Sequence, residues 1–453
     1  MKQLRIMAAL VFVLRLAGSV TVGEARPADP NGNGFYLPEN PAYTILDSAR
    51  DSVRFAVWTL VPFKGHLASK SSFIDSTGAV MGWHEFGHLE GPGWAANAAG
   101  GAYELHRFAA FTGDTSLSRK AVQLLDHVLE DGFINHDTGF ITGYRHTQTN
   151  EFCLNYQHKN NWFCAGSMAK IAYQLLIFSD HVDETRQKKM RDIAAKTAHW
   201  IDTHVGFAPN GWFPRRCFSD GRPFPKNCYG DGDILFEKSG DGLFILQLYT
   251  ELTRRQLADY RQVVRDKTDL FIAAGGFFGS INHDTYDEHE SVSYSVGFRT
   301  LRQVANLLDD NTISRFAHDR CLAGLDQFKM CEDRNGVSTQ GLLFMEKTWD
   351  TAYLWESAEA ALAYTEAYQD TGATAHLQTA RTILHAIAKH HHGPHGFLTE
   401  GVDWNNHVGK QHHFNEAEYG DIKYTEPLLN NLHLVEPTLL ILELEKKVHT
   451  VDK

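Results

Sequence analysis

The chain has 453 residues, of which 43% are hydrophobic, 12% aromatic and 22% charged, and this composition excludes an intrinsically disordered protein. Lys and Arg total 43 against 55 for Asp and Glu, and the net charge of −12 argues against nucleic acid or an anionic membrane as the main partner. The length suits two or three ordinary domains or one large closed domain.

The N-terminal segment has the pattern of a secretory signal peptide. Lys2 and Arg5 precede a short apolar run that begins at Ile6, and small residues follow this run. We therefore expect residues 1–25 to be cleaved, residues 26–453 to form a single domain, and the mature protein to be secreted or periplasmic. The apolar run is too short to cross a bilayer as a helix and no later run is long enough, so no membrane insertion is expected.

Six cysteines occur as three pairs of near neighbours along the sequence. An even number of cysteines in a secreted chain favours disulfides, and none forms the C-x-x-C unit of a zinc ribbon or a thioredoxin site. Free buried thiols are the alternative. The predicted disulfides are Cys153–Cys164, Cys217–Cys228 and Cys321–Cys331.

Hydrophobic periodicity predicts about twelve amphipathic helices after the leader. Some neighbouring helices are joined by very short turns, such as those containing Gly113 and Gly372. The other connections are long and polar, and several open with Gly-Phe, as at Gly132 and Gly276. The predicted helices lie near 41–62, 93–112, 115–131, 161–180, 183–205, 241–256, 257–274, 291–309, 312–328, 350–370, 373–390 and 430–448.

The alternation of short and long connections constrains the packing of these helices. Antiparallel hairpins packed side by side place all the long connections at one end of the molecule. Twelve helices can then close as six inner and six outer helices. The N-termini of the inner helices would converge beneath the long connections, where helix dipoles favour anionic groups or catalytic carboxylates. The inner helices would begin at about 93, 161, 241, 291, 350 and 430.

This pattern resembles the six-hairpin glycosidase superfamily, the (α/α)6 toroids. The resemblance is carried by the Thr-Gly-Asp turn at 112–114, the Gly-Phe loop openings and the helix start at 91–97, and it covers about residues 40–448. It implies an all-α toroid of six helical hairpins with long loops on one face, and a carbohydrate-active enzyme. Glycoside hydrolases, polysaccharide lyases and sugar epimerases all use this toroid, so the fold does not fix the chemistry.

His84, Glu85 and His88 match the HExxH motif, in which two imidazoles on one helix face bind zinc and the glutamate acts as a base. The extended spacing of the metzincins is only partly present, because Trp94 stands where the third ligand is needed. Gly87 within the motif also weakens a helix there. We therefore expect no metal and interpret the segment as a loop leading into the first inner helix.

Glycoside hydrolysis needs two carboxyl groups, one protonated and one ionised. The candidates are Glu85 and Glu90 in the first long loop, and Asp233 and Asp241 in the third. Asp241, in Ser-Gly-Asp-Gly, is similar in position to the catalytic Asp of inverting six-hairpin enzymes, and Glu90 is similar to their general acid. The alternative for each is a helix-capping carboxylate, which Asp at a helix start often is.

A second set of residues favours lyase chemistry. His158 and Asn161 precede the second inner helix, and Tyr294 follows the start of the fourth. They resemble the Asn, His and Tyr with which lyases on this toroid neutralise a uronate carboxyl and move its neighbouring proton. A loop braced by a disulfide is the alternative. The start of the last inner helix, 426–436, faintly resembles acylglucosamine-type epimerases, which are generally cytoplasmic, unlike the secreted protein expected here.

Tryptophans in the predicted loops suit a carbohydrate ligand, because sugar C–H faces stack on aromatic rings. Packing in the toroid interior is the alternative. The candidate substrate-binding residues are Trp83, Trp94, Asn161, Trp162, Trp212, Trp349 and Trp404.

These observations predict a secreted glycoside hydrolase that acts on an oligo- or polysaccharide by inverting carboxylate acid–base catalysis. The alternatives are a polysaccharide lyase that cleaves a uronate-containing glycan by β-elimination, and a non-catalytic glycan-binding toroid. The sequence contains no P-loop, no G-x-G-x-x-G and no G-x-S-x-G, so no nucleotide cofactor is expected. We expect a monomer whose partner is its carbohydrate substrate.

Overall fold

The computed structural model describes residues 34–37, 40–156, 161–224, 238–279, 281, 287–347, 351–408 and 419–451. The predicted signal peptide lies outside the described residues. Four individual candidates also lie outside them, namely His158, Cys228, Asp233 and Trp349.

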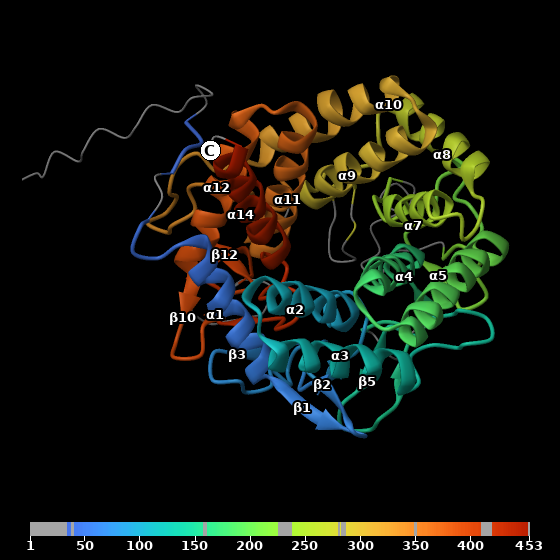
Figure 1. The fold of residues 1–453 in the computed structure, drawn as a ribbon, viewed down its shortest axis with the longest axis horizontal. Coiled ribbons are helices and arrows are strands. Elements are labelled where there is room, and N and C mark those ends of the chain that lie inside the picture. The colour runs from blue at the N-terminus through green and yellow to red at the C-terminus, as the bar shows by residue number, and fades with distance from the viewer. Residues whose placement is uncertain are drawn as a thin grey trace, which may run out of the picture.

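Within the described residues, six inner helices form a closed ring, in which each helix packs against the next and the last packs against the first (Figure 1). The ring confirms the all-α (α/α)6 toroid predicted from the alternating connections. Each inner helix begins close to its predicted start. The inner helices are α2 (Ala98–Thr112), α4 (Ala165–Phe178), α7 (Gly242–Arg254), α9 (Ser291–Leu308), α11 (Leu354–Thr371) and α14 (Val435–Val451).

An outer layer of helices surrounds the ring and packs against it (Figure 1). The outer helices are amphipathic, whereas the N-terminal parts of the inner helices are largely buried, and in α7 every residue from Gly242 to Thr253 is buried. The outer helices are α1 (Ile45–Trp58), α3 (Thr115–Glu130), α5 (Glu184–His204), α8 (Arg261–Ala273), α10 (Asn311–Phe316) and α12 (Thr374–Ile387).

The helix predicted over 312–328 is broken in the structure. It consists of α10, a π-helical segment η2 (Ala317–Leu322) and a 3-10 turn η3 (Leu325–Phe328). Gly324 lies at the second break and packs against the ring of Tyr294, where a Cβ would lie 2.2 Å from the ring. Two further 3-10 turns, η1 (Ser179–His181) and η4 (Ala388–His390), extend α4 and α12.

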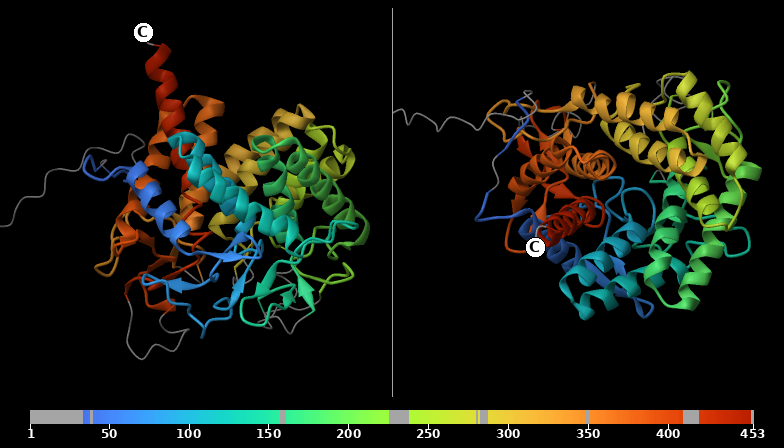
Figure 2. Two further views of the ribbon diagram at one scale, coloured as in Figure 1. Left: turned by 60° about the horizontal axis from the view of Figure 1, so that its bottom comes forward. Right: turned by 45° about the horizontal axis from the view of Figure 1, so that its top comes forward.

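The two faces of the toroid differ. In the left view of Figure 2 the strands and long connections lie at the bottom, and the C-terminal end of α14 projects from the top. All strand pairs are antiparallel, and β14 pairs with β3, which joins the last long connection to the first. The strands are β1 (Leu60–Phe63), β2 (His66–Ser69), β3 (Ile74–Asp75), β4 (Leu89–Glu90), β5 (Tyr144–His146), β6 (Phe152–Cys153), β7 (Trp162–Phe163), β8 (Cys217–Phe218), β9 (Ala352–Tyr353), β10 (His391–His392), β11 (Phe397–Leu398), β12 (Gly401–Asp403), β13 (Gly420–Asp421) and β14 (Tyr424–Thr425).

Among the described helices, side-chain caps occur only in the outer layer, where α8 and α12 lack one. The outer helices α1, α3 and α5 begin at Thr44, Asp114 and Asp183, whose side chains accept hydrogen bonds from the first turn. The inner helices α2, α4, α7, α9 and α11 have no side-chain cap. The first-turn N–H groups of the inner helices therefore face the long connections without a capping side chain.

The structure forms neither of the two predicted disulfides whose cysteines are both described, and it does not support the prediction of three local disulfides. Cys153 lies in β6 and pairs with β5, whereas Cys164 precedes α4 beside β7, which belongs to a different sheet. Cys321 is buried in η2, and Cys331 is exposed beyond η3. The two cysteines of each of these two pairs thus belong to different parts of the structure, although they are close in sequence. No described helix is both long and apolar enough to cross a bilayer.

Candidate active site

Asp241 lies directly before α7, on the long-loop face, and is 1% exposed. Its Oδ2 accepts a hydrogen bond from Ser239 Oγ at 2.6 Å. The backbone N–H of Asp241 in turn donates to Ser239 Oγ at 3.1 Å. Burial raises the pKa of Asp241 from 3.8 to about 7, although Ser239, Arg215 and Arg216 act in the opposite direction. The side chain makes no capping hydrogen bond, which excludes the capping alternative.

The backbone around Asp241 is held from two sides. The indole Nε1 of Trp212 donates to the carbonyl of Ser239 at 2.8 Å. Gly166, in the first turn of α4, packs against Asp241 so closely that a Cβ at this position would lie 2.4 Å from the Asp241 carbonyl oxygen. These contacts fix the carboxyl at the junction of α4 and α7. Asp241 Oδ1 has no hydrogen-bond partner among the described residues.

Two more buried carboxyls stand at the start of the neighbouring inner helices. Glu290 precedes α9 and Glu356 lies in the first turn of α11, and both are 0% exposed. Glu290 Oε2 accepts from the N–H of Ile281 at 2.6 Å, and Glu356 Oε2 accepts from Ser291 Oγ at 2.7 Å. The remaining oxygen of each carboxyl is buried without a hydrogen-bond partner among the described residues.

The pKa values of these two carboxyls are also raised. Burial is the main cause for both, and it raises the pKa of Glu356 to about 8. The pKa of Glu290 lies well above its ordinary value because of burial and the charge of Glu356. Glu346 adds a further negative charge close to both. Neighbouring carboxyls that cannot all ionise retain a proton near neutral pH.

Two fully buried arginines lie beside the carboxyls, and both come from the connection that follows α5. The charge of Arg215 lowers the pKa of Asp241 and of Glu290, and Arg216 also lowers that of Asp241. The guanidinium of Arg216 lies 4.1 Å from the centre of the Trp162 ring. We name Asp241, Glu290, Glu356, Arg215 and Arg216 the carboxyl cluster.

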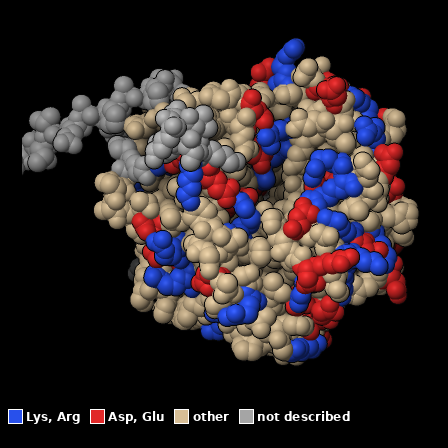
Figure 3. All heavy atoms as spheres, in the orientation of Figure 1, with Lys and Arg blue, Asp and Glu red and all other residues tan. Residues whose placement is uncertain are grey.

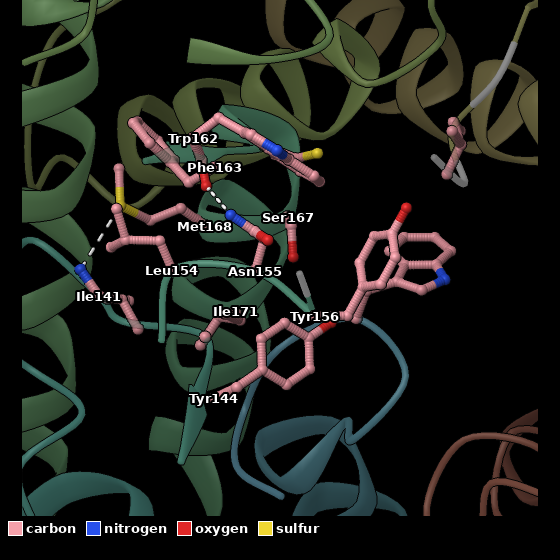
Figure 4. Close-up of a pocket in the computed structure, with 14 residues that line it drawn as sticks. Ile141, Tyr144, Leu154, Asn155, Tyr156, Trp162, Phe163, Ser167, Met168 and Ile171 are labelled. Carbon is pink, nitrogen blue, oxygen red and sulfur yellow. Dashed lines mark hydrogen bonds between the residues drawn. The ribbon is translucent and has the colours of Figure 1, made fainter. Parts of the chain in front are cut away.

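A pocket adjoins the carboxyl cluster (Figure 4). Trp162, which lines it, is the ring on which Arg216 stacks, and Ile281, which also lines it, donates its N–H to Glu290. Figure 4 shows Tyr144 and Tyr156 below and Trp162 and Phe163 above, with Asn155 between them. Aromatic faces with an amide among them match the requirements of a sugar ring.

Glu90, the predicted acid, lies in β4 and is 0% exposed. Its carboxylate accepts from Arg145 Nε at 2.6 Å and lies 3.0 Å from His127 Nε2. The other nitrogen of His127 lies 2.7 Å from Asp131, which also contacts His66 at 2.9 Å. Glu90 therefore belongs to a buried ionic network that joins the first hairpin to its loop, apart from the carboxyl cluster.

The HExxH segment is not helical. Residues 84–88 form a bend and turns, so its two histidines do not share a helix face, and Glu85 is exposed. The ring of His84 stacks on Phe73, with centroids 3.9 Å apart. His88 lies near His146 instead, with ring centroids 5.6 Å apart. The geometry that a zinc protease motif needs is absent from this segment.

Tyr294 and Asn161 are the residues of the lyase alternative that the structure describes, and the ring and hydrogen-bond partners that Tyr294 has among the described residues do not belong to the carboxyl cluster. Tyr294 stacks on Phe278 with centroids 3.9 Å apart, and its hydroxyl lies 2.7 Å from His289 Nδ1. The rings of His289 and of Phe328 in η3 also lie beside Tyr294. Asn161 is exposed before β7.

The predicted tryptophans divide between surface and interior. Trp83 is 50% exposed and Trp404 is partly exposed, so both can meet a ligand directly. Trp94 and Trp162 are almost fully buried but line or border cavities. Trp212 is 0% exposed and supports the turn at Ser239.

Sequence reasoning missed Glu290, Glu356 and the two arginines. A usable signal existed for Glu356, because it stands in the apolar start of a predicted inner helix, where an ionisable group is expensive to bury. Arg215 and Arg216 form an adjacent pair in a loop and gave no pattern.

No protein-family model matches the chain, and no curated protein matches it. Solved structures do resemble it: a cellobiose 2-epimerase from Bacillus thermoamylovorans is 13% identical with a TM-score of 0.63, covering 88% of this chain and 98% of that one. A D-mannose isomerase is 12% identical, with a TM-score of 0.61, and covers 88% of this chain and 97% of its own. A possible GH105-family member from Salmonella enterica is 12% identical, with a TM-score of 0.51 and coverage of 90% and 96%.

The chain has the (α/α)6 toroid fold of these structures. The likeness extends over nearly the full length of these structures, which confirms the resemblance drawn from the hairpin turns and loop openings. At this level of identity the likeness establishes the fold alone, so the reaction must be argued from the residues of this chain.

Proposed function

We propose that this protein is a carbohydrate-active enzyme, a secreted glycoside hydrolase that cleaves an oligo- or polysaccharide by inverting acid–base catalysis. The observation that carries the proposal is the set of buried carboxyls at the starts of α7, α9 and α11, with pKa values of about 7 for Asp241 and about 8 for Glu356. Carboxyls whose protonation changes near neutral pH are what this chemistry requires.

The roles follow from the environments of the carboxyls. Glu356 and Glu290 hold a proton near neutral pH, so this pair supplies the general acid that protonates the glycosidic oxygen. Asp241, beside Arg215 and Arg216, ionises at lower pH than Glu356 and serves as the general base that activates water. Glu90 is not assigned the acid role, because Arg145 and His127 hold its carboxylate.

The adjoining pocket, with a volume of about 30 Å³, offers a contact for part of a sugar residue next to this pair. The Trp162 and Tyr156 rings line it, each 2% exposed and with Arg216 over Trp162, and Ile281 connects its wall to Glu290. Inversion requires room for a water between acid and base, with the two carboxyl groups about 6.5–9.5 Å apart. The names of the solved structures, which include epimerases and a GH105 member, support a carbohydrate substrate.

Product analysis on a glycan panel tests the proposal. New reducing ends without the ultraviolet absorbance of a new double bond support hydrolysis. That absorbance would establish the lyase instead, and a change of sugar configuration without bond cleavage would establish an epimerase. Binding without any product would make the protein a glycan-binding toroid.

Two variants connect the activity to the carboxyl cluster. Asp241→Asn and Glu356→Gln should each lower kcat by more than about a hundredfold, the scale of lost acid–base catalysis. Asp114→Asn is the matched control, since Asp114 also begins a helix but caps α3 on the outer layer. Equal activity in all three variants would contradict the assignment.

A further inference from the structure

A second cavity lies inside the ring of inner helices, away from the long loops. Glu104 of α2, Lys170 of α4, Trp355 and Glu359 of α11 and His433 before α14 line it. Its volume is about 80 Å³, where a single water needs about 10–15 Å³ in the same measure. The cavity therefore has room for several waters or for a small ligand.

An aromatic layer separates this cavity from the long-loop side. The ring of Trp94 lies 5.2 Å from that of Trp355 and 5.9 Å from that of Phe244, measured between centroids. The three rings come from three different parts of the ring of helices and are all nearly fully buried. Lys170 Nζ lies 4.1 Å from the centre of Trp94, on the cavity side of this layer.

The opposite side of the cavity is open. Tyr103, Tyr173, Gln174 and Ile177 line it and are partly exposed, and all four follow the first turn of their helices. Figure 1 and Figure 3 view the molecule from the side on which α14 ends, and Figure 3 shows the middle of this face hollowed, with charges of both signs around it. The mouth therefore opens at the C-terminal ends of the inner helices.

Part of the polar lining is already paired. His433 Nε2 lies 2.7 Å from Glu359 Oε2, and Arg299 forms ion pairs with Glu359 and Glu366. These groups hold one another in place across α9, α11 and α14. They fix the shape of the cavity before any ligand arrives.

Three groups of the lining retain unused hydrogen-bonding capacity. Lys170 is 8% exposed and makes no hydrogen bond or ion pair among the described residues, although it lies over Trp94. Glu104 is 6% exposed, and its Oε2 has no hydrogen-bond partner there. The buried Oε1 atom of Gln174 also has no hydrogen-bond partner among the described residues. Such buried groups are destabilising unless something in the cavity bonds to them.

From these contacts we infer that the cavity is a second ligand site, which binds a polyhydroxylated molecule of monosaccharide size entering from the face opposite the long loops. Glu104 and Gln174 need donors, whereas the Lys170 ammonium needs an acceptor. A hydroxyl group does both, and Trp355 supplies an apolar wall for the carbon face of a sugar.

An anion fits this cavity less well than a neutral sugar. The lining contains the carboxyl groups of Glu104, Glu359 and Glu436 together with the cations Lys170 and Arg299. Arg299 is already paired with Glu359 and Glu366, and Glu436 with Arg107, so neither Arg299 nor Glu436 is free for a ligand. Burial lowers the pKa of Lys170 to about 8, so a share of these side chains is uncharged at pH 8. A ligand that depended on an ion pair with Lys170 would weaken there.

The site goes beyond the proposed function and is tested by binding alone. Calorimetry and tryptophan fluorescence, to which Trp94 and Trp355 contribute, should detect D-glucose, D-mannose or D-galactose at up to about 10 mM, where a millimolar complex is visible. D-glucuronate is the anionic probe. Binding should persist in Asp241→Asn, so loss of catalysis does not affect this test.

Two variants locate the site. Lys170→Met keeps the length of the side chain and should weaken binding about tenfold or more, a loss of about 1.4 kcal/mol. Ile177→Trp narrows the mouth and should block binding while activity on the long-loop face is unchanged. Lys189→Met, which breaks only an exposed ion pair with Glu130, is the control.

The outcomes separate cleanly. No binding of any neutral sugar by the wild-type chain would show that water alone fills the cavity and would overturn the inference. Tighter binding of D-glucuronate than of the neutral sugars would overturn the ligand class. Sugar binding that survives Ile177→Trp but disappears in Asp241→Asn would place the ligand at the carboxyl cluster instead. Melting temperatures of Lys170→Met and Ile177→Trp near that of wild type would confirm that they fold.

Discussion

Replacing Asp241 with Asn should stabilise the folded protein at alkaline pH while removing most of its activity. Asn has nearly the same shape as Asp and can still accept the hydrogen bond from Ser239 Oγ. It cannot ionise, so it never places a charge in this buried position. An active-site residue that lowers stability in its working state is expected where catalysis needs an unusual pKa.

The size of the effect follows from the pKa. Burial moves the pKa of Asp241 from 3.8 to about 7, and this difference of about three units corresponds to about 4 kcal/mol. The folded protein holds the proton more tightly than the unfolded chain. The resulting stabilisation is complete below a pH of about 4 and is lost as the pH rises through about 7. The variant does not lose it.

Thermal unfolding and kcat measured from pH 4 to pH 8, values chosen at about the two ends of this titration, test the prediction. Relative to wild type, Asp241→Asn should gain up to about 4 kcal/mol across this range, while kcat falls at every pH. Asp114→Asn on α3 should show neither change. A variant that is destabilised equally at all pH values and keeps its kcat would refute the reasoning.

Three further predictions concern the surroundings of the site. Ser239→Ala removes a hydrogen bond that lowers the pKa of Asp241, so the limb of the kcat profile due to Asp241 should move up by about one pH unit. Glu90→Gln leaves Arg145 buried without its carboxylate and should destabilise the protein by about 3–5 kcal/mol; an unchanged melting temperature with a large loss of kcat would return the acid role to Glu90. Activity should survive strong chelation, and a loss restored by zinc alone would revive the ligand role of His84 and His88.

The ring of helices was predictable because its signals are local. Amphipathic periodicity sets the extent of each helix, and the short turns at Gly113 and Gly372 force neighbouring helices to be antiparallel. Both glycines adopt positive φ, at 75° and 67°, as such turns require. The short strands gave no such signal, since most have two residues and exist only through pairing with distant segments.

The candidate site was only partly predictable, because burial is a tertiary property. Asp241 stood out through its Ser-Gly-Asp-Gly context, and the structure places it at the start of an inner helix. Glu90 had an equally suggestive position, but Arg145 and His127 arrive from other parts of the chain and hold it. The disulfide prediction failed for the same reason, since Cys153 and Cys164 are near in sequence but lie in separate sheets.

Two opposing electrostatic effects act on the carboxyl cluster, namely the helix dipole and the cost of burying a charge. A carboxylate at a helix N-terminus is stabilised by the helix dipole, usually by about 0.3–1 kcal/mol, which lowers its pKa. At Asp241 the pKa is raised to about 7 instead, so the cost of burying the charge exceeds the dipole effect several times over. Asp114 of the outer layer is exposed, and its carboxylate caps α3 by accepting hydrogen bonds from the first turn, as an aspartate at a helix start usually does. The same residue type thus serves stability on the outer layer of the toroid and, in the proposed mechanism, proton transfer on the inner one. Burial of the side chain by the surrounding helices distinguishes the two positions.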